Sequence, residues 1–250
     1  MRNILLDLEY DGTGFRGSQV QARGRTVQGE LERALQRLTR QETRIVLAGR
    51  TDAGVHASGQ RANFHTASEL PLETFWRGLN ALLPPDLAVL RVQEVPEQFH
   101  ARFDARRRSY RYTLFRAAVR SPLARQYAWH VPGSLDLAAM AAGLELLLGE
   151  HDFASFGGAE PGGRSRQTVR TLYQAHCQEE TPWLHLDFSA NAFLRGMVRN
   201  IVGQLVLLGR GLCDLDRFRA IFAACDRRQA GAAAPAHGLC LTRVDYDEVT

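Results

Sequence analysis

Residues 44–65 read RIVLAGRTDAGVHASGQRANFH, in which two strand-like stretches flank a segment that contains three glycines, Gly49, Gly54 and Gly59. The first stretch predicts a strand over Arg44–Ala48, and the second predicts a strand over Gln60–His65. Because no helix is expected between them, the segment favours an α+β fold over a strictly alternating parallel sheet.

The sequence on either side predicts the same mixture of strands and helices. Thr26 has the side chain of an N-cap, and apolar residues recur at helical spacing from Val27 to Leu38. Further strands are expected over Asn3–Tyr10, Ala88–Val95, Ser109–Phe115, Thr168–His176, Leu184–Phe188 and Cys240–Tyr246, and further helices over Leu72–Leu83, Phe193–Leu208 and Asp214–Ala224 and after Ser134 or Asp136. We therefore expect helices on one face of a mixed, largely antiparallel sheet, with a seam between two halves near residues 97–107. The Gly/Pro/Ser segment Gly157–Ser165 predicts a mobile loop.

The composition is that of an ordinary globular protein. With 250 residues, 45% of them hydrophobic, the chain can bury a core without disulfides or a structural metal. No apolar run approaches the roughly 18 residues needed to cross a bilayer, and the N-terminal residues lack the pattern of a signal peptide. The four cysteines are widely separated and show no metal-binding spacing. We therefore expect a cytoplasmic protein with no membrane partner.

All 31 basic residues are arginines, since the chain contains no lysine. This excludes lysine Schiff-base enzymes and Walker-A phosphate loops. The formal net charge is +4, and eight arginines against one acid lie between Arg102 and Arg125, interleaved with Tyr110, Tyr112 and Phe115. Guanidinium groups bind phosphates and aromatic rings stack on unpaired bases, so this stretch predicts nucleic-acid binding.

Two patterns that often indicate cofactors are weak in this sequence. Gly12, Gly14 and Gly17 spell G-x-G-x-x-G after a strand, but the next helix begins only at Thr26, too late for its N-terminus to meet a dinucleotide. The eight histidines do not show the H-E-x-x-H spacing. We therefore expect a glycine-rich turn and no metal.

The loop Gly49–Ala57 contains an acid, a guanidinium and an imidazole. Its glycines permit tight turns that can direct Asp52 into a cleft, although a lone aspartate in a turn also serves as a capping residue. Arg199 lies in the apolar stretch Phe193–Leu208, where a desolvated guanidinium needs an anionic partner, and Asp52 is the natural candidate. The alternative for Arg199 is a side chain that reaches solvent from the helix surface.

The loop sequence GRTDAGVHASGQ, at residues 49–60, resembles the signature of the tRNA pseudouridine synthase A family. Other motifs of that family occur in order, namely YDGTGFRG near the start, TVQGELERAL at 26–35, FHARFDA at 99–105 with SYRY at 109–112, HDFASF at 151–156, TVRTL at 168–172, FLRGMVRNIVG at 193–203, and AGAAAPAHGLCLTRVDY up to Tyr246. One departure is Ser18, which stands where the family usually has tryptophan, so this loop lacks the ring that a stacking role would need.

The resemblance implies roles for five residues. Asp52 matches the catalytic aspartate of the family, Arg199 the arginine that pairs with it, and Tyr110 the tyrosine that stacks on the target base. Leu239 matches the apolar residue that lines the uracil pocket, and Arg50 matches an arginine that assists extrusion of the base.

The resemblance also implies a fold and partners. In the pseudouridine synthase fold two similar α/β subdomains, here residues 1–104 and 105–250, share the sheet, with helices on one face and an RNA-binding cleft on the other. The family acts as a homodimer on the anticodon arm of tRNA, at uridines 38, 39 and 40, with neither metal nor organic cofactor. No DNA partner is expected.

The reaction itself breaks the C1′–N1 bond of uridine and forms a C1′–C5 bond, without gain or loss of atoms. A carboxylate can take part and be regenerated, while a partly apolar pocket keeps the detached uracil from escaping. Attack of Asp52 at C1′, attack at C6 and a glycal route all stay open. Two other classes also stay open from the residues alone: a non-catalytic RNA-binding module, and a nucleotide-dependent oxidoreductase that rests on the three glycines.

Overall fold

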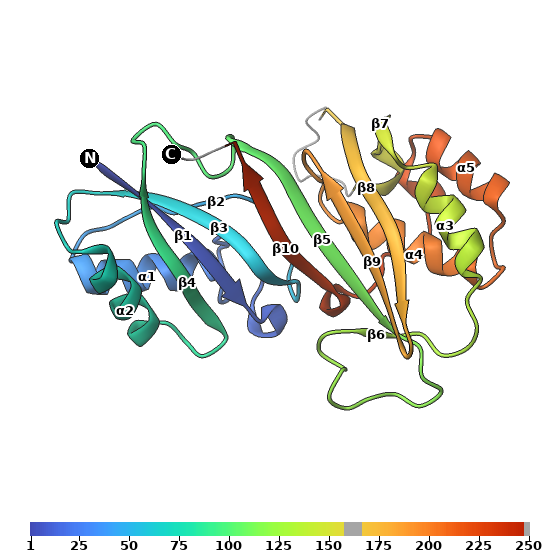
Figure 1. Ribbon diagram of the computed structural model, residues 1–250, viewed down its shortest axis with the longest axis horizontal. Helices are drawn as coiled ribbons and strands as arrows, with labels where there is room; N and C mark the ends of the chain where they lie inside the picture. The colour runs from blue at the N-terminus through green and yellow to red at the C-terminus, as the bar shows by residue number, and fades with distance from the viewer. Residues whose placement is uncertain (158–166, 248–250) are drawn as a thin grey trace. The chain divides into compact units, whose positions relative to one another are not determined.

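The computed structural model describes residues 1–157 and 167–247 of the chain (Figure 1). Within these residues it is an α+β fold with a mixed sheet and five α-helices. The backbone forms two compact units, one from residues 1–108 with the chain from residue 240 onward, the other from residues 109–239. Of the expected Gly157–Ser165 loop, residues 158–165 lie outside the described residues.

The first unit is built on a ladder with β1 (Arg2–Tyr10) in the middle. This strand pairs antiparallel with β3 (His56–Thr66) on one side and with β4 (Leu87–Val95) on the other. β2 (Val46–Leu47) pairs antiparallel with β3, and β10 (Leu239–Tyr246) pairs with β3 in parallel. The C-terminal strand therefore belongs to the N-terminal ladder.

Two helices, α1 (Val27–Thr39) and α2 (Leu72–Leu82), complete the first unit. They pack against each other, and α2 packs against β4. The Thr26 hydroxyl accepts the backbone N–H of Gly29 at 3.2 Å, which confirms the predicted N-cap. The buried face of α1 consists of Val27, Leu31, Ala34 and Leu35, at the spacing that one side of a helix requires.

The second unit contains β5 from Ser109 onward and all of β9, β8 and β7, which follow one another in that order in the sheet. Their bounds are Ala105–Phe115 for β5, Gly149–Asp152 for β7, Val169–Glu180 for β8 and Trp183–Ala190 for β9. β8 pairs antiparallel with both β7 and β9, while the short β6 (Trp129–His130) pairs in parallel with β5. The sheet is thus mixed and largely antiparallel, as the sequence predicts.

Three helices cover the strands of the second unit: α3 (Leu137–Glu145), α4 (Met197–Gly209) and α5 (Leu215–Ala223). α3 packs against β8, α4 and α5. Alternate residues of β9 are buried, as expected for a strand with one face in a core; they are Leu184, Leu186 and Phe188.

Three differences between the structure and the sequence prediction concern the residues of the candidate site and the division into units. α4 begins at Met197 rather than at Phe193, because Gly196 adopts a left-handed conformation (φ 69°) and serves as the N-cap. β3 begins at His56 rather than at Gln60. The predicted boundary between residues 104 and 105 places the last strand in the second subdomain, whereas β10 from Cys240 onward lies in the first unit, where it pairs with β3. The RNA-binding cleft stays a prediction.

No helix in residues 1–157 and 167–247 has both the length and the apolar character needed to cross a membrane.

Candidate active site

The loop that carries Asp52 connects β2 to β3 in the first unit. Asp52 is partly buried, and its backbone carbonyl accepts the N–H of Val55 at 3.1 Å. Gly54 has φ 79°, a left-handed conformation that residues with side chains rarely adopt. The loop is therefore a tight turn, with Arg50 exposed at its start.

Thr51, the neighbour of Asp52, is held by hydrogen bonds from two other segments. Its N–H donates to Ser18 Oγ at 2.8 Å, and its carbonyl accepts the N–H of Ser18 at 3.1 Å. The Thr51 and Tyr10 hydroxyls lie 2.9 Å apart. Burial raises the pKa of Tyr10 to about 12, so its hydroxyl keeps its proton at neutral pH. The backbone next to Asp52 is thus fixed by buried polar groups.

The beginning of the loop is fixed by Gln60, a fully buried residue of β3. Its side-chain nitrogen donates to the Gly49 carbonyl at 2.9 Å and to the Tyr10 hydroxyl at 3.3 Å. Its side-chain oxygen accepts the Gly49 N–H at 3.2 Å. Gln60 therefore links Gly49, the first residue of the loop, to the Tyr10 hydroxyl, which in turn bonds to Thr51.

Two glycines of the G-x-G-x-x-G pattern, Gly12 and Gly17, pack against this loop. Gly12 is so close that a Cβ there would come within 2.1 Å of the Val55 carbonyl oxygen. Gly17 has φ 91°, and a Cβ there would lie 3.0 Å from the Thr51 carbonyl oxygen. These glycines allow one loop to lie directly on the backbone of another, which agrees with the glycine-rich turn expected from the sequence.

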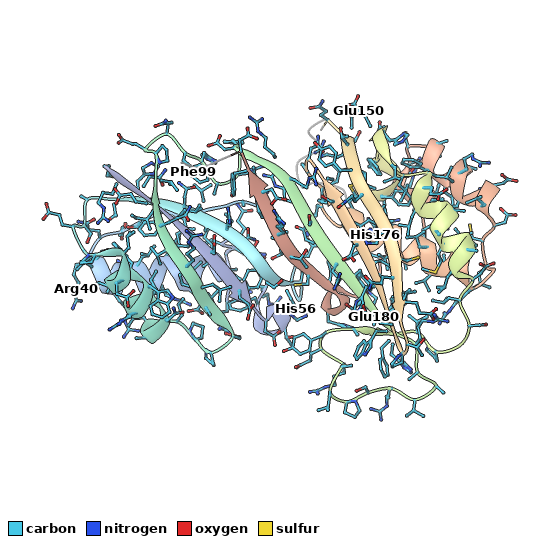
Figure 2. All side chains as sticks on the ribbon, in the orientation of Figure 1. Arg40, His56, Phe99, Glu150, His176 and Glu180 are labelled. Carbon is cyan, nitrogen blue, oxygen red and sulfur yellow. The ribbon has the colours of Figure 1, made fainter. Side chains whose placement is uncertain are left out.

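His56 follows the loop, at the start of β3 (Figure 2). The side chain is buried, and its Nδ1 accepts the backbone N–H of Gly12 at 3.0 Å. This bond ties the end of the Asp52 loop to the turn at Gly12. The sequence assigned no role to His56, and the structure gives it this anchoring role.

Tyr110 lies on β5 in the second unit, with 7% of its surface exposed. Its ring meets Phe193 edge to face, with the centroids 5.0 Å apart and the planes at 82°. Phe193 precedes α4 in the FLRG motif, so that motif restricts the orientation of the Tyr110 ring.

Arg199 lies on α4 and is partly buried. Its Nε donates to the Ala234 carbonyl at 2.8 Å, and its carbonyl accepts the Ala234 N–H at 2.9 Å. The buried Tyr112 on β5 donates its hydroxyl to the next carbonyl, that of Pro235, at 2.8 Å. These bonds hold the segment that leads to Leu239, a buried residue, against α4 and β5.

The predicted site residues are divided between the units. Arg50 and Asp52 lie in the first unit, and Tyr110, Arg199 and Leu239 lie in the second. The pairing of Asp52 with Arg199 stays a prediction. Within residues 1–157 and 167–247, no three His, Cys, Asp or Glu side chains are grouped in a way that could hold a metal ion.

Comparison with known proteins assigns the chain to a family. The family model described as tRNA pseudouridine synthase matches residues 8–104 and 144–247. The chain belongs to this family. The tRNA pseudouridine synthase A of Chloroflexus aurantiacus is 53% identical, over 98% of this chain and 89% of its own length. The proteins of the same name from Roseiflexus castenholzii and Geobacter sp. (strain M21) are 50% and 45% identical, over 99% of this chain and 92% and 100% of their own lengths.

Three anchors of the Asp52 loop were missed from the sequence: Tyr10, Ser18 and Gln60. Tyr10 and Gln60 follow the alternation of the core residues on their strands, so a polar group on a buried face was an available signal. Ser18 gave no such signal. It lies in a polar stretch of the sequence, yet it is completely buried and bonds to Thr51 in both directions.

Ser18→Ala tests this anchor. The substitution leaves the buried N–H of Thr51 without its acceptor, which costs about 1–3 kcal/mol. We expect a lower melting temperature and a fall in kcat of about tenfold, with little change in KM, because the backbone beside Asp52 loses a restraint. Steady-state kinetics and thermal unfolding measure both effects. Ser134→Ala, at an exposed position, is the control; equal kcat for the two variants would contradict the assignment.

Proposed function

We propose that this protein converts uridine to pseudouridine at positions 38, 39 and 40 in the anticodon stem-loop of tRNA. The observation that carries the proposal is the Asp52 loop, a family signature whose neighbouring backbone is fixed by buried bonds to Ser18, Tyr10 and Gln60. The family match over most of the chain supports the same function. The reaction class is an isomerisation in which C1′ is transferred from N1 to C5 within one nucleotide.

In this proposal Asp52 is the carboxylate that acts on the nucleotide and is regenerated. Arg199 pairs with Asp52 and keeps it charged and oriented, since a neighbouring cation favours the ionised form. The Ala234 carbonyl that accepts from its Nε supports this role, because it restricts the direction of the guanidinium.

Tyr110 stacks on the target uracil, Leu239 lines the pocket for the ring and Arg50 assists extrusion of the base. The edge-to-face contact with Phe193 supports the role of Tyr110, because it holds the tyrosine ring in one orientation. The exposure of Arg50 beside Asp52 leaves its guanidinium accessible to RNA.

The substrate is anionic, and the charge of the protein suits it. Extrusion of a base from its stack costs about a few kcal/mol, which contacts between arginines and phosphates offset. All 31 basic residues are arginines, and the sequence pI is about 9.1. We further propose that the protein works in the cytoplasm as a homodimer, with one tRNA contacting both subunits, and that it needs neither metal nor organic cofactor.

The direct test is a pseudouridine map of tRNA that lacks the modification, before and after incubation with the purified protein and no additive. New pseudouridine at positions 38, 39 and 40 supports the proposal. Salt-sensitive tRNA binding without any product would instead favour a non-catalytic RNA-binding module. Sedimentation of the protein with and without tRNA tests the homodimer.

Tyr110→Phe separates stacking from proton transfer. The phenylalanine ring can still stack on the uracil and contact Phe193, so we expect tRNA affinity within about twofold of wild type. Turnover should fall by about 10-fold or more if the hydroxyl takes part in the proton transfers. Single-turnover rates at saturating tRNA measure this, and Tyr173→Phe, on an exposed part of β8, is the control. Wild-type turnover of the Tyr110 variant would remove the hydroxyl from the chemistry.

A further inference from the structure

The turn between β4 and β5 exposes an aromatic ring that has no role in the proposed reaction. Phe103, in the FHARFDA motif, has 73% of its surface in solvent and is the most exposed aromatic residue in the described part of the chain. Its ring stacks on the imidazole of His100, with the centroids 4.3 Å apart and the planes at 27°. The guanidinium carbon of Arg102 lies 5.5 Å from the Phe103 centroid.

Hydrogen bonds within the turn hold this stack in place. His100 Nδ1 accepts the backbone N–H groups of Arg102 and Phe103, each at 3.2 Å. The His100 carbonyl accepts the N–H groups of Phe103 and Asp104, each at 3.1 Å. Asp104 Oδ2 accepts the N–H of His100 at 2.8 Å. The imidazole is therefore fixed, and with it the ring that it stacks against.

The base of the turn is anchored in the core of the first unit. The N–H of Ala101, a buried residue, donates to Asn63 Oδ1 at 2.9 Å, and its carbonyl accepts the Tyr246 hydroxyl at 2.7 Å. Asn63 also donates to the carbonyl of Phe99, which precedes the turn (Figure 2). A rigid base below an exposed ring is a preformed surface, and ligand binding there requires little ordering of the protein.

The arginines near the Phe103 ring indicate which kind of ligand fits this surface. Residues 100–108 contain four arginines and one acid, Asp104. Arg106 is paired with Asp247, and the buried Arg108 donates to backbone carbonyls inside the unit. Arg102 is exposed on the same turn as the ring, and Arg107 is exposed near the start of β5, which follows the turn. A flat aromatic face next to exposed guanidinium groups fits a ligand that combines a planar ring with phosphates.

We propose that the Phe103–His100 stack is a platform for an unpaired base of the bound tRNA, with Arg102 and Arg107 contacting neighbouring phosphates. The proposal rests on tRNA being the substrate and adds a binding site that is separate from the residues assigned to the target uridine. Stacking on an aromatic ring does not depend on which base is presented, so the platform contributes affinity rather than sequence choice.

Phe103→Ala tests the platform by equilibrium filter binding of unmodified tRNA at fixed salt. We expect the affinity of Phe103→Ala for tRNA to be about tenfold lower than that of wild type, because one stacked base is lost. Phe103→Trp keeps an aromatic ring at this position and should bind tRNA like wild type. Leu212→Ala, which removes another exposed apolar side chain (71% exposed), should bind tRNA like wild type. A fully paired RNA duplex of similar length offers no unpaired base, and its affinity should be the same for wild type and Phe103→Ala.

Three results would overturn the platform. They are wild-type tRNA affinity for Phe103→Ala, an equal loss of affinity for the duplex, and a change in oligomeric state with tRNA affinity unaltered, which would make Phe103 a protein contact. Product formation is a separate readout. Wild-type protein that binds tRNA through Phe103 but forms no pseudouridine would refute the proposed function and leave the platform intact.

Discussion

Asp52→Asn is expected to abolish pseudouridine formation while the protein stays folded and still binds tRNA. The amide has nearly the same size as the carboxylate, so the turn from Asp52 to Val55, which is closed by a backbone bond, keeps its geometry. An amide is neither a useful nucleophile nor a base, so the rate should fall by on the order of 10³-fold or more. Single-turnover mapping of pseudouridine in tRNA measures the loss.

The Asp52→Asn assay needs a control variant, and it needs control measurements of folding and of tRNA binding. Asp216→Asn, at an exposed position in the first turn of α5, removes a carboxylate that pairs with Arg219 and should leave turnover unchanged. The melting temperature and tRNA affinity of Asp52→Asn should stay close to wild type. If the variant still forms product at a tenth of the wild-type rate, Asp52 is not the catalytic carboxylate; if it loses tRNA binding as well, the result reports binding and not chemistry.

The parts of the fold that were predictable from the sequence are those determined by interactions between residues close together in the chain. Helix α1 is an example, because its cap at Thr26 and its apolar face lie within a few turns of one another. The predicted start of α4 was wrong, because a glycine in an apolar run fits either a helix or a left-handed turn. At Gly196 tertiary packing determines which of the two conformations forms. β6 and β7 were missed because strands of two and four residues exist through their partners, not through their own periodicity.

In the candidate site, too, features carried by local sequence could be predicted, and contacts between distant residues could not. Asp52 could be found because its loop carries a contiguous signature. The anchors of that loop join residues distant in sequence: Ser18 and Thr51 are 33 positions apart, and Tyr10 and Thr51 are 41 apart. Such contacts are set by how the strands pair, which a single sequence does not display. Arg199 was recognised as a guanidinium in need of a partner, but its bond to the Ala234 carbonyl was not foreseen.

Gly12→Ala should disturb the Asp52 loop from outside it. A Cβ at Gly12 would lie 2.1 Å from the Val55 carbonyl oxygen, a backbone atom that no rotamer change can move aside. The 52–55 turn or the 12–14 turn must therefore shift, and the bond from the Gly12 N–H to His56 Nδ1 is strained as well. Overpacking of this kind destabilises by about 1–3 kcal/mol. If Asp52 acts as proposed, a displacement of its carboxylate by about 1 Å is expected to slow turnover by on the order of 10²-fold.

Gly14→Ala is a matched control for Gly12→Ala, because it makes the same change in the same motif. Its nearest neighbours would be the ends of two side chains, Arg25 at 3.2 Å and Asp86 at 3.4 Å, which can give way by a few tenths of an ångström. We expect a melting temperature and single-turnover rate near wild type for Gly14→Ala, and a large loss in both for Gly12→Ala. Both variants should be assayed at a temperature where each is folded, so that a slower rate reports the position of Asp52 and not the folded fraction. Equal rates for the two variants would mean that the close approach of Gly12 to Val55 has no part in holding the Asp52 loop.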